Sequence, residues 1–109
     1  MKRTREQILR LLREFQRQLV GLYGQRLKGV YLYGSHARDE AGEDSDIDVA
    51  VVLAGHVNRA EERRRVSELR CELSLRENCL IMPFFLSEEE YRLAPQAIHR
   101  SIVTEGVPI

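Results

Sequence analysis

The segment "YLYGSHARDEAGEDSDIDVAVVL", residues 31–53, joins two hydrophobic runs through a polar connection. The first run stops at Gly34-Ser35, and the second is entered through Asp46-Ile47-Asp48. Side chains two residues apart in a β-strand point to the same side, so both carboxylates would face one point in space. Close carboxylates repel each other and lose hydration when they enter a strand. A divalent cation is the simplest group that offsets both costs, and we expect Asp46 and Asp48 to hold one.

The start of the connection has the features of a phosphate-binding turn. We expect a strand over 29–33, a short helix over 35–40, and a loop over 41–45. A strand that ends in Gly34-Ser35 and continues into a helix presents N–H groups and a hydroxyl at the positive end of the helix dipole. Gly34 has no Cβ, so the backbone can approach a triphosphate closely. Arg38 can either reach a phosphate or pair with a neighbour, and His36 is expected on the helix surface.

The flanking sequence predicts helices and strands in alternation. Before the segment, apolar residues at helical spacing predict a helix over 5–23, with Thr4 as its N-cap and Gly24 as its end. The apolar stripe of this helix comprises Ile8, Leu11, Leu12, Phe15, Leu19 and Leu22.

After the segment, residues 46–53 become continuously apolar, which is typical of a strand buried on both faces. Asn58 and Glu61 resemble a capping box that opens a second helix. The apolar stripe of that helix comprises Val66, Leu69 and Leu73, with Ala60 as a further candidate. A third strand over 80–86 contains Pro83, which indicates a sheet edge or a bulge.

The C-terminal part predicts two short helices and a tail. Ser87 begins a second capping box, Pro95 interrupts the helix that follows, and the last helix runs to about Thr104 before Gly106. Residues 107–109 are expected as a tail. The whole order predicts one domain over 1–109, of α/β (α+β) class, with one sheet and helices packed on it.

Composition excludes several classes of protein. The 109 residues are 43% hydrophobic and 31% charged, and Lys+Arg and Asp+Glu balance at 17 each. Residues 1–28 carry eight basic and two acidic side chains, whereas residues 39–48 carry six acids. No apolar run approaches the roughly 20 residues that span a bilayer. The only cysteines, Cys71 and Cys79, are expected as reduced thiols of a cytoplasmic protein.

The two motifs together resemble those of a known family. The stretch "GSHAR" at 34–38, followed by "SDID" at 45–48, resembles the signature of the nucleotidyltransferase superfamily with the DNA polymerase β-like fold. In size the chain is similar to the minimal members, the MNT proteins, which are antitoxin partners of HEPN toxins. The resemblance implies a small mixed sheet, with Gly34 and Ser35 on the β- and γ-phosphates of ATP, and Arg38 is a further candidate for nucleotide binding. It also implies that Asp46 and Asp48 coordinate Mg²⁺ while AMP is transferred to a hydroxyl of a HEPN-type partner.

Two departures from the family pattern affect this expectation. Asp39 stands where members commonly have glycine, which is a surface change. Active members also carry a third carboxylate on a later strand, whereas residues 80–86 contain no acid. Glu77 and Glu88 flank that strand and are the candidates for a substitute. A missing general base is typically worth about 10²–10⁴-fold in rate, so slow transfer is compatible with the pattern.

Two further functions stay open from the sequence. A catalytically weakened antitoxin could bind nucleotide and act on its partner by contact alone, and the missing third acid favours this alternative. Modification of nucleic-acid ends would use the basic first helix. However, the overall charge is neutral and no aromatic stacking platform accompanies the arginines, so we do not expect a nucleic-acid partner.

Overall fold

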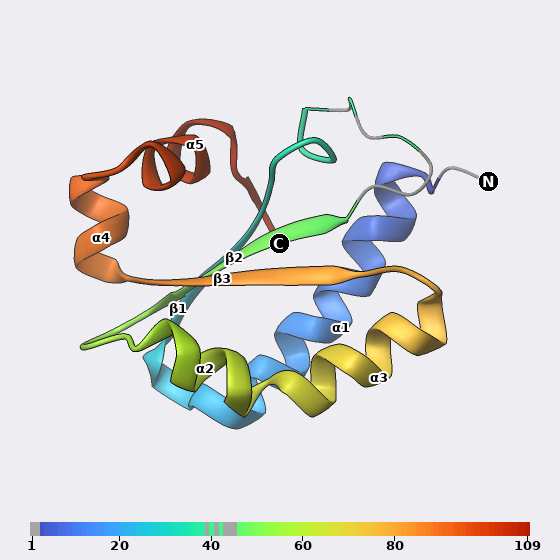
Figure 1. The fold of residues 1–109 in the computed structure, drawn as a ribbon, viewed down its shortest axis with the longest axis horizontal. Helices are drawn as coiled ribbons and strands as arrows, with labels where there is room; N and C mark the ends of the chain where they lie inside the picture. Colours follow the sequence, from blue (N-terminus) through green and yellow to red (C-terminus); the bar gives the residue numbers. More distant parts are fainter. Residues whose placement is uncertain (1–2, 39, 41, 43–45) are drawn as a thin grey trace.

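The computed structural model describes residues 3–38, 40, 42 and 46–109, which form one four-stranded sheet with helices on both faces (Figure 1). The elements in chain order are α1 Arg5–Tyr23, a 3₁₀ turn Gly24–Arg26, β1 Leu27–Tyr33, β2 Ile47–Leu53, α2 Arg59–Arg65, α3 Ser67–Glu77, β3 Ile81–Ser87, α4 Glu88–Leu93, α5 Ala97–Glu105 and β4 Val107–Pro108. The predicted α/β class is therefore confirmed.

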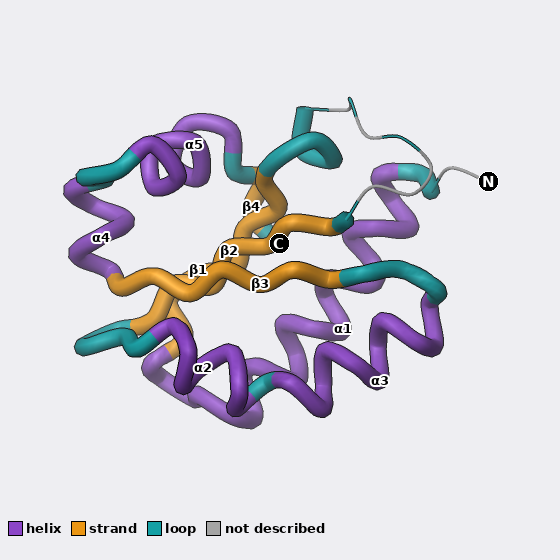
Figure 2. Tube along the Cα trace, viewed as in Figure 1, coloured by secondary structure: helices purple, strands orange, loops and turns teal. Residues whose placement is uncertain are grey.

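The sheet is mixed, with strand order β3-β2-β1-β4 (Figure 2). β1 pairs antiparallel with β2 and with β4, whereas β2 and β3 are parallel. A parallel pair needs a crossover connection, and α2 and α3 supply it. Helices α1, α2 and α3 cover one face of the sheet, where the larger core cluster lies. Helices α4 and α5 cover part of the other face.

Helix α1 begins and ends where the sequence predicts. Thr4 and Gln7 form a capping box at its start, and Gly24 ends it with φ of 54°. The predicted apolar stripe is buried except for Leu22, whose side chain is 48% exposed. That part of the prediction is wrong, because Tyr23 takes the buried position in the last turn.

The second predicted helix is broken into α2 and α3 at Val66, whose backbone leaves the helical region. Val66 and Leu73 are buried as expected, but Ala60 is exposed. A residue that the pattern did not select, Glu62, is buried instead. Val66, at the break, and Leu73, in α3, both belong to the larger core cluster.

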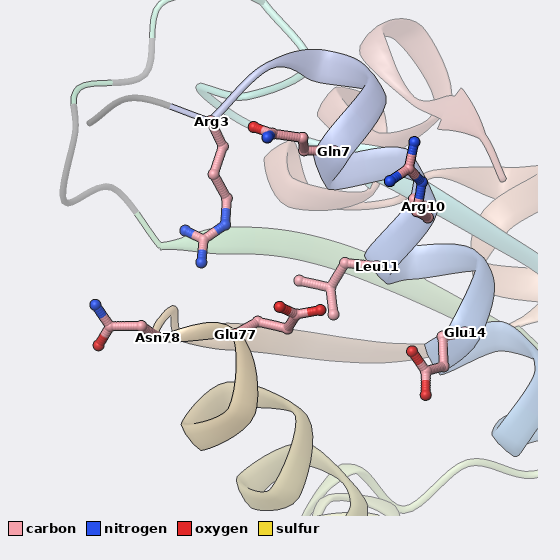
Figure 3. A pocket seen from close by; sticks show the side chains of 7 residues that line it. All are labelled: Arg3, Gln7, Arg10, Leu11, Glu14, Glu77 and Asn78. Carbon is pink, nitrogen blue, oxygen red and sulfur yellow. The ribbon is translucent and has the colours of Figure 1, made fainter.

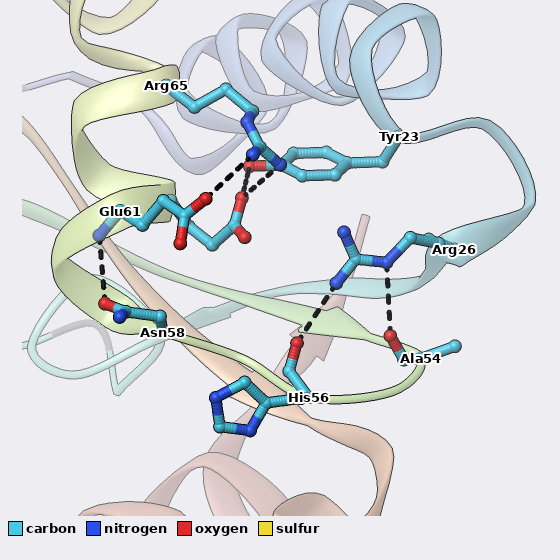
Figure 4. Close-up of polar contacts among 8 residues, drawn as sticks. Tyr23, Arg26, Ala54, His56, Asn58, Glu61 and Arg65 are labelled. Atoms are coloured by element: carbon cyan, nitrogen blue, oxygen red, sulfur yellow. Dashed lines mark hydrogen bonds and ion pairs between the residues drawn. The ribbon is translucent and has the colours of Figure 1, made fainter.

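A polar cluster explains why Glu62 is buried. The Tyr23 hydroxyl donates to its Oε1 at 2.8 Å, and Arg65 Nη1 donates to the same oxygen at 2.9 Å. Arg26 donates to the backbone carbonyls of Ala54 and His56 (Figure 4). These contacts join the end of α1 to α2 and to the loop after β2. A buried carboxylate is tolerated only when it is paired in this way.

The exposed edge of the sheet is β3, as Pro83 predicts. Proline has no N–H to leave unpaired, and α3 covers the start of this edge. The Ile81 N–H donates to the Ser74 hydroxyl at 3.4 Å, and Arg70 donates to the Ile81 carbonyl at 3.3 Å. The other edge is β4, whose residues the sequence predicts as a tail. That prediction is wrong, because Val107 and Pro108 pair with β1.

None of the helices within the described ranges is long and apolar enough to cross a membrane.

Candidate active site

The end of β1 and the start of β2 bring Gly34 and Asp48 into direct contact. Tyr33 pairs with Asp48 in the antiparallel register, so the turn after β1 begins beside this carboxylate. Gly34 has φ of +76°, and a Cβ placed on it would lie 2.5 Å from Asp48 Oδ2. Only glycine fits this position, both for its backbone conformation and for the space that Asp48 occupies. The predicted phosphate turn and one predicted metal ligand therefore lie side by side.

The charge environment of Asp48 suits a cation. The side chain is half-buried, and burial raises its pKa above the ordinary value, as does the negative charge of Asp46. The His36 and Arg38 side chains lower it by smaller amounts. Asp46 is exposed and lies just before β2, which begins one residue later than predicted. The two carboxylates thus repel each other beside the turn, and oxygen donors of this kind suit Mg²⁺.

The segment after Gly34 forms turns instead of the predicted helix over 35–40. The Arg38 N–H donates to the Gly34 carbonyl at 3.1 Å, but the Glu40 N–H donates to Ser35, five residues earlier. The backbone therefore closes as a wide turn and does not continue as an α-helical ladder. Ser35 is half-buried at the start of this turn. Most of the predicted loop, residues 41 and 43–45, and Asp39 lie outside the described residues.

One side chain that the sequence did not single out, Arg5, holds this turn against α1. Arg5, the first residue of α1, donates to the carbonyls of His36 at 3.2 Å and Ala37 at 2.8 Å. His36 is buried, with 9% of its surface exposed, so the expectation of a surface position is wrong. The turn faces α1 because its carbonyls accept from Arg5, and this carries His36 inward. No local sequence signal connects Arg5 to residues 31 positions later.

Arg38 pairs with two carboxylates. Its Nε donates to Glu40 at 3.0 Å, and its Nη1 donates to Glu105 at the end of α5 at 2.9 Å. Of the two roles left open by the sequence, pairing with neighbours is the one present here. Glu105 is 67 residues away in the chain, so no local pattern connects it with Arg38.

In the part of the chain that the structure describes, β3 does not supply the third carboxylate that active family members carry, because none of its residues is acidic. The parallel register pairs Asp48 with Met82, which is 41% exposed. Paired residues of adjacent strands share a face of the sheet, so Met82 occupies the position that a third acid would need. Tyr33, the neighbour on the other side, is no substitute base, because burial and the Asp48 charge raise its pKa to about 12.

Neither predicted substitute lies near this position. Glu77 lines a pocket of about 470 Å³ between the N-terminal half of α1 and the end of α3 (Figure 3). These helices cover the face of the sheet to which Ile47 and Val49 point, whereas Asp48 alternates with them and points to the other face. Glu88 begins α4, six residues after Met82, which corresponds to about 20 Å along a strand. Among the residues that the structure describes, no group of three or more His, Cys, Asp and Glu side chains could hold a metal ion.

Comparisons with known proteins identify the family of the chain. The family model described as "Nucleotidyltransferase domain" matches residues 9–102. Two proteins of Methanocaldococcus jannaschii are similar in sequence. "Putative protein adenylyltransferase MJ0141" is 29% identical over 77 residues, which cover 71% of this chain and 77% of that protein. "Putative protein adenylyltransferase MJ0604" is 32% identical over 96 residues, which cover 87% of this chain and 90% of that protein.

Solved structures share the fold. A crystal structure described as "a putative nucleotidyltransferase from Sulfolobus solfataricus" superposes with a TM-score of 0.69 at 23% identity, covering 95% of this chain and 80% of that one. A structure described as "the toxin-antitoxin with AMP-PNP" gives a TM-score of 0.57 at 23% identity, with coverages of 97% and 72%. The family model spans most of the chain and includes the turn and both aspartates. This chain therefore belongs to the nucleotidyltransferase domain family, and the prediction of a nucleotidyltransferase is confirmed.

Proposed function

We propose that this protein transfers AMP from ATP, with Mg²⁺, to a hydroxyl group on a protein partner, a HEPN-type toxin. The contact between the Gly34 backbone and the Asp48 carboxylate carries the proposal. A triphosphate that lies on the turn would have its phosphates within reach of this carboxylate. The proposal places the protein in the cytoplasm, where ATP is available.

Asp46 and Asp48 would hold the metal. They fit it because they are oxygen donors that repel each other, and because Asp48 is half-buried beside the turn. When bound, Mg²⁺ neutralises charge on the transferring phosphoryl group and orients the reacting oxygens. Two protein ligands leave the remaining positions to phosphate oxygens and water.

The chain's own residues would orient the nucleotide. Gly34 and Ser35 would hold the β- and γ-phosphates through backbone N–H groups and the hydroxyl, and Arg38 would add a positive charge. The acceptor oxygen then forms a bond to the α-phosphorus while the bond to pyrophosphate breaks. Met82 cannot accept the hydroxyl proton, so in this proposal the proton passes to solvent. Slow transfer is the expected consequence.

A protein acceptor is supported by the relatives. Both sequence relatives are named as protein adenylyltransferases, and a fold relative was solved as a toxin–antitoxin complex with AMP-PNP. A second candidate function is that of an antitoxin that binds nucleotide and silences its partner by contact alone. The position of Met82 beside Asp48 favours this alternative, because a third metal ligand and base is then missing.

The first experiment measures nucleotide binding. Titration calorimetry with ATP, with and without MgCl₂, is expected to show Mg²⁺-dependent binding by the wild-type chain. An Asp46→Asn/Asp48→Asn variant should lose the dependence on Mg²⁺. The matched control is Glu68→Gln/Glu72→Gln, which removes two exposed charges from α3 on the other side of the sheet. Equal Mg²⁺ dependence in both variants would overturn the metal site.

The second experiment measures transfer. The chain is incubated with a HEPN-type protein and with ATP labelled at either the α- or the γ-phosphate. The proposal expects label in the partner from α-labelled ATP only, and none with the Asp46→Asn/Asp48→Asn variant. Silencing of the partner that survives this double change, without transferred label, would establish action by contact instead.

A further inference from the structure

We propose that Glu105 is a positioning residue, which holds the Arg38 guanidinium at the triphosphate site. This inference rests on the proposed function and adds a residue to its site. The observation behind it is the ion pair of 2.9 Å between Arg38 Nη1 and Glu105 Oε2, which joins the phosphate turn to the end of α5.

Arg38 is part of the phosphate turn. Its backbone N–H donates to the Gly34 carbonyl, so its side chain leaves the backbone one hydrogen bond away from the glycine that contacts Asp48. The two ion pairs use Nε and Nη1, and Nη2 takes part in neither. Guanidinium presents its donors in a fixed plane, so holding two of its nitrogens sets the direction of the third. The Arg38 charge also reaches Asp48, where it offsets a small part of the rise in pKa that burial and Asp46 cause.

Glu105 is fixed relative to that turn by the strand that both adjoin. The Gly106 N–H donates to the Ile102 carbonyl at 2.9 Å and closes α5 directly after Glu105. The next residues form β4, which pairs with β1 through Leu32 and Val107. β1 in turn leads into Gly34. A short hydrogen-bonded path therefore connects Glu105 to the start of the turn.

The location of Glu105 at a helix C-terminus is electrostatically unfavourable without the ion pair to Arg38. A helix C-terminus carries partial negative charge and favours basic side chains, not acidic ones. The last turn of α5 contains no basic residue, and Glu105 is its final residue. Arg38 supplies the missing positive charge from the phosphate turn. Removing Glu105 should therefore cost little stability, because an exposed ion pair and an unfavourable dipole contact are lost together.

The test is a double-mutant cycle on ATP affinity. Titration calorimetry with MgATP is carried out on wild type, Arg38→Gln, Glu105→Gln and the double variant. We expect Arg38→Gln to weaken binding about tenfold and Glu105→Gln about threefold, with the double variant equal to Arg38→Gln alone. Pyrophosphate should show the same pattern and adenosine none. The melting temperatures of all four proteins should agree within about 4 °C.

The matched control is Glu14→Gln. Glu14 pairs with Arg76 between α1 and α3, and its side chain is 33% exposed, against 34% for Glu105. This control should leave ATP affinity unchanged. If Glu105→Gln binds ATP as wild type does, or if its effect adds to that of Arg38→Gln, the positioning role is overturned while the proposed function stands. If the wild-type chain itself does not bind ATP, the proposed function and this inference fail together.

Discussion

Substituting Met82 with aspartate is expected to strengthen the metal site. Met82 lies in register with Asp48 on the adjacent strand, and neighbouring strands are about 4.8 Å apart. A carboxylate at this position would face the same space as the Asp48 side chain. Met82 is 41% exposed, so its removal also loses apolar burial, and Met82→Asn loses the same burial. Relative to Met82→Asn, the effect should therefore be dominated by the added charge.

The sign of the effect should depend on Mg²⁺. Without metal, Met82→Asp places like charges side by side, which costs up to about 1 kcal/mol and lowers the melting temperature by about 4–8 °C. A third ligand that tightens Mg²⁺ binding tenfold returns about 1.4 kcal/mol at saturating metal. The Mg²⁺-induced rise in melting temperature should thus be larger by about 6–11 °C than in wild type. An added base near the acceptor should also raise label transfer about hundredfold.

Melting followed by circular dichroism, with EDTA or with a series of MgCl₂ concentrations, measures this response. Met82→Asn is the matched control, since it has the same size and the same poor strand propensity without the charge. A Met82→Asp protein whose response to Mg²⁺ equals that of Met82→Asn would refute the reasoning. It would mean that residue 82 does not face the metal.

Three further predictions concern single residues. Because burial and Asp46 raise the pKa of Asp48, the folded state binds a proton more tightly than the unfolded chain does. The free energy of unfolding of the metal-free protein should then fall as the pH rises from about 3.8 through the pKa that Asp48 has in the folded state. Asp48→Asn should remove this part of the pH dependence in melts between pH 4 and 7. Gly34→Ala should destabilise the protein by more than about 1 kcal/mol and abolish Mg²⁺-dependent ATP binding. Gly21→Ala should instead stabilise α1 by about 1 kcal/mol, because a Cβ on Gly21 meets nothing within 4 Å. Equal effects of the two glycine changes would contradict the contact with Asp48. Tyr23→Phe should lower the free energy of unfolding by about 2 kcal/mol, because the buried Glu62 carboxylate loses a donor; an unchanged urea midpoint would count against this.

Local patterns predicted most elements of this fold correctly. The capping boxes at Thr4 and Ser87 begin helices because side-chain oxygens satisfy free N–H groups within three residues. The buried run after Asp46 forms a central strand, since a strand that is covered on both faces carries apolar residues at successive positions. Pro83 correctly indicated an edge, since proline cannot donate to a ladder. Each of these signals depends on residues that are neighbours in the chain.

The site depends on contacts between residues that are far apart in sequence. Spacing in the sequence suggested that Gly34 and Asp48 act together, but only strand register placed the carboxylate against the glycine. Register likewise placed Met82 at the third position and excluded Glu88. Pairing of the C-terminal residues with β1 brought Glu105 to Arg38. The sequence by itself determined most of the helices, three of the four strands and the acidic pair, because their signals are local. Tertiary packing decided the turn after β1, the pairing of β4 and which groups meet at the site.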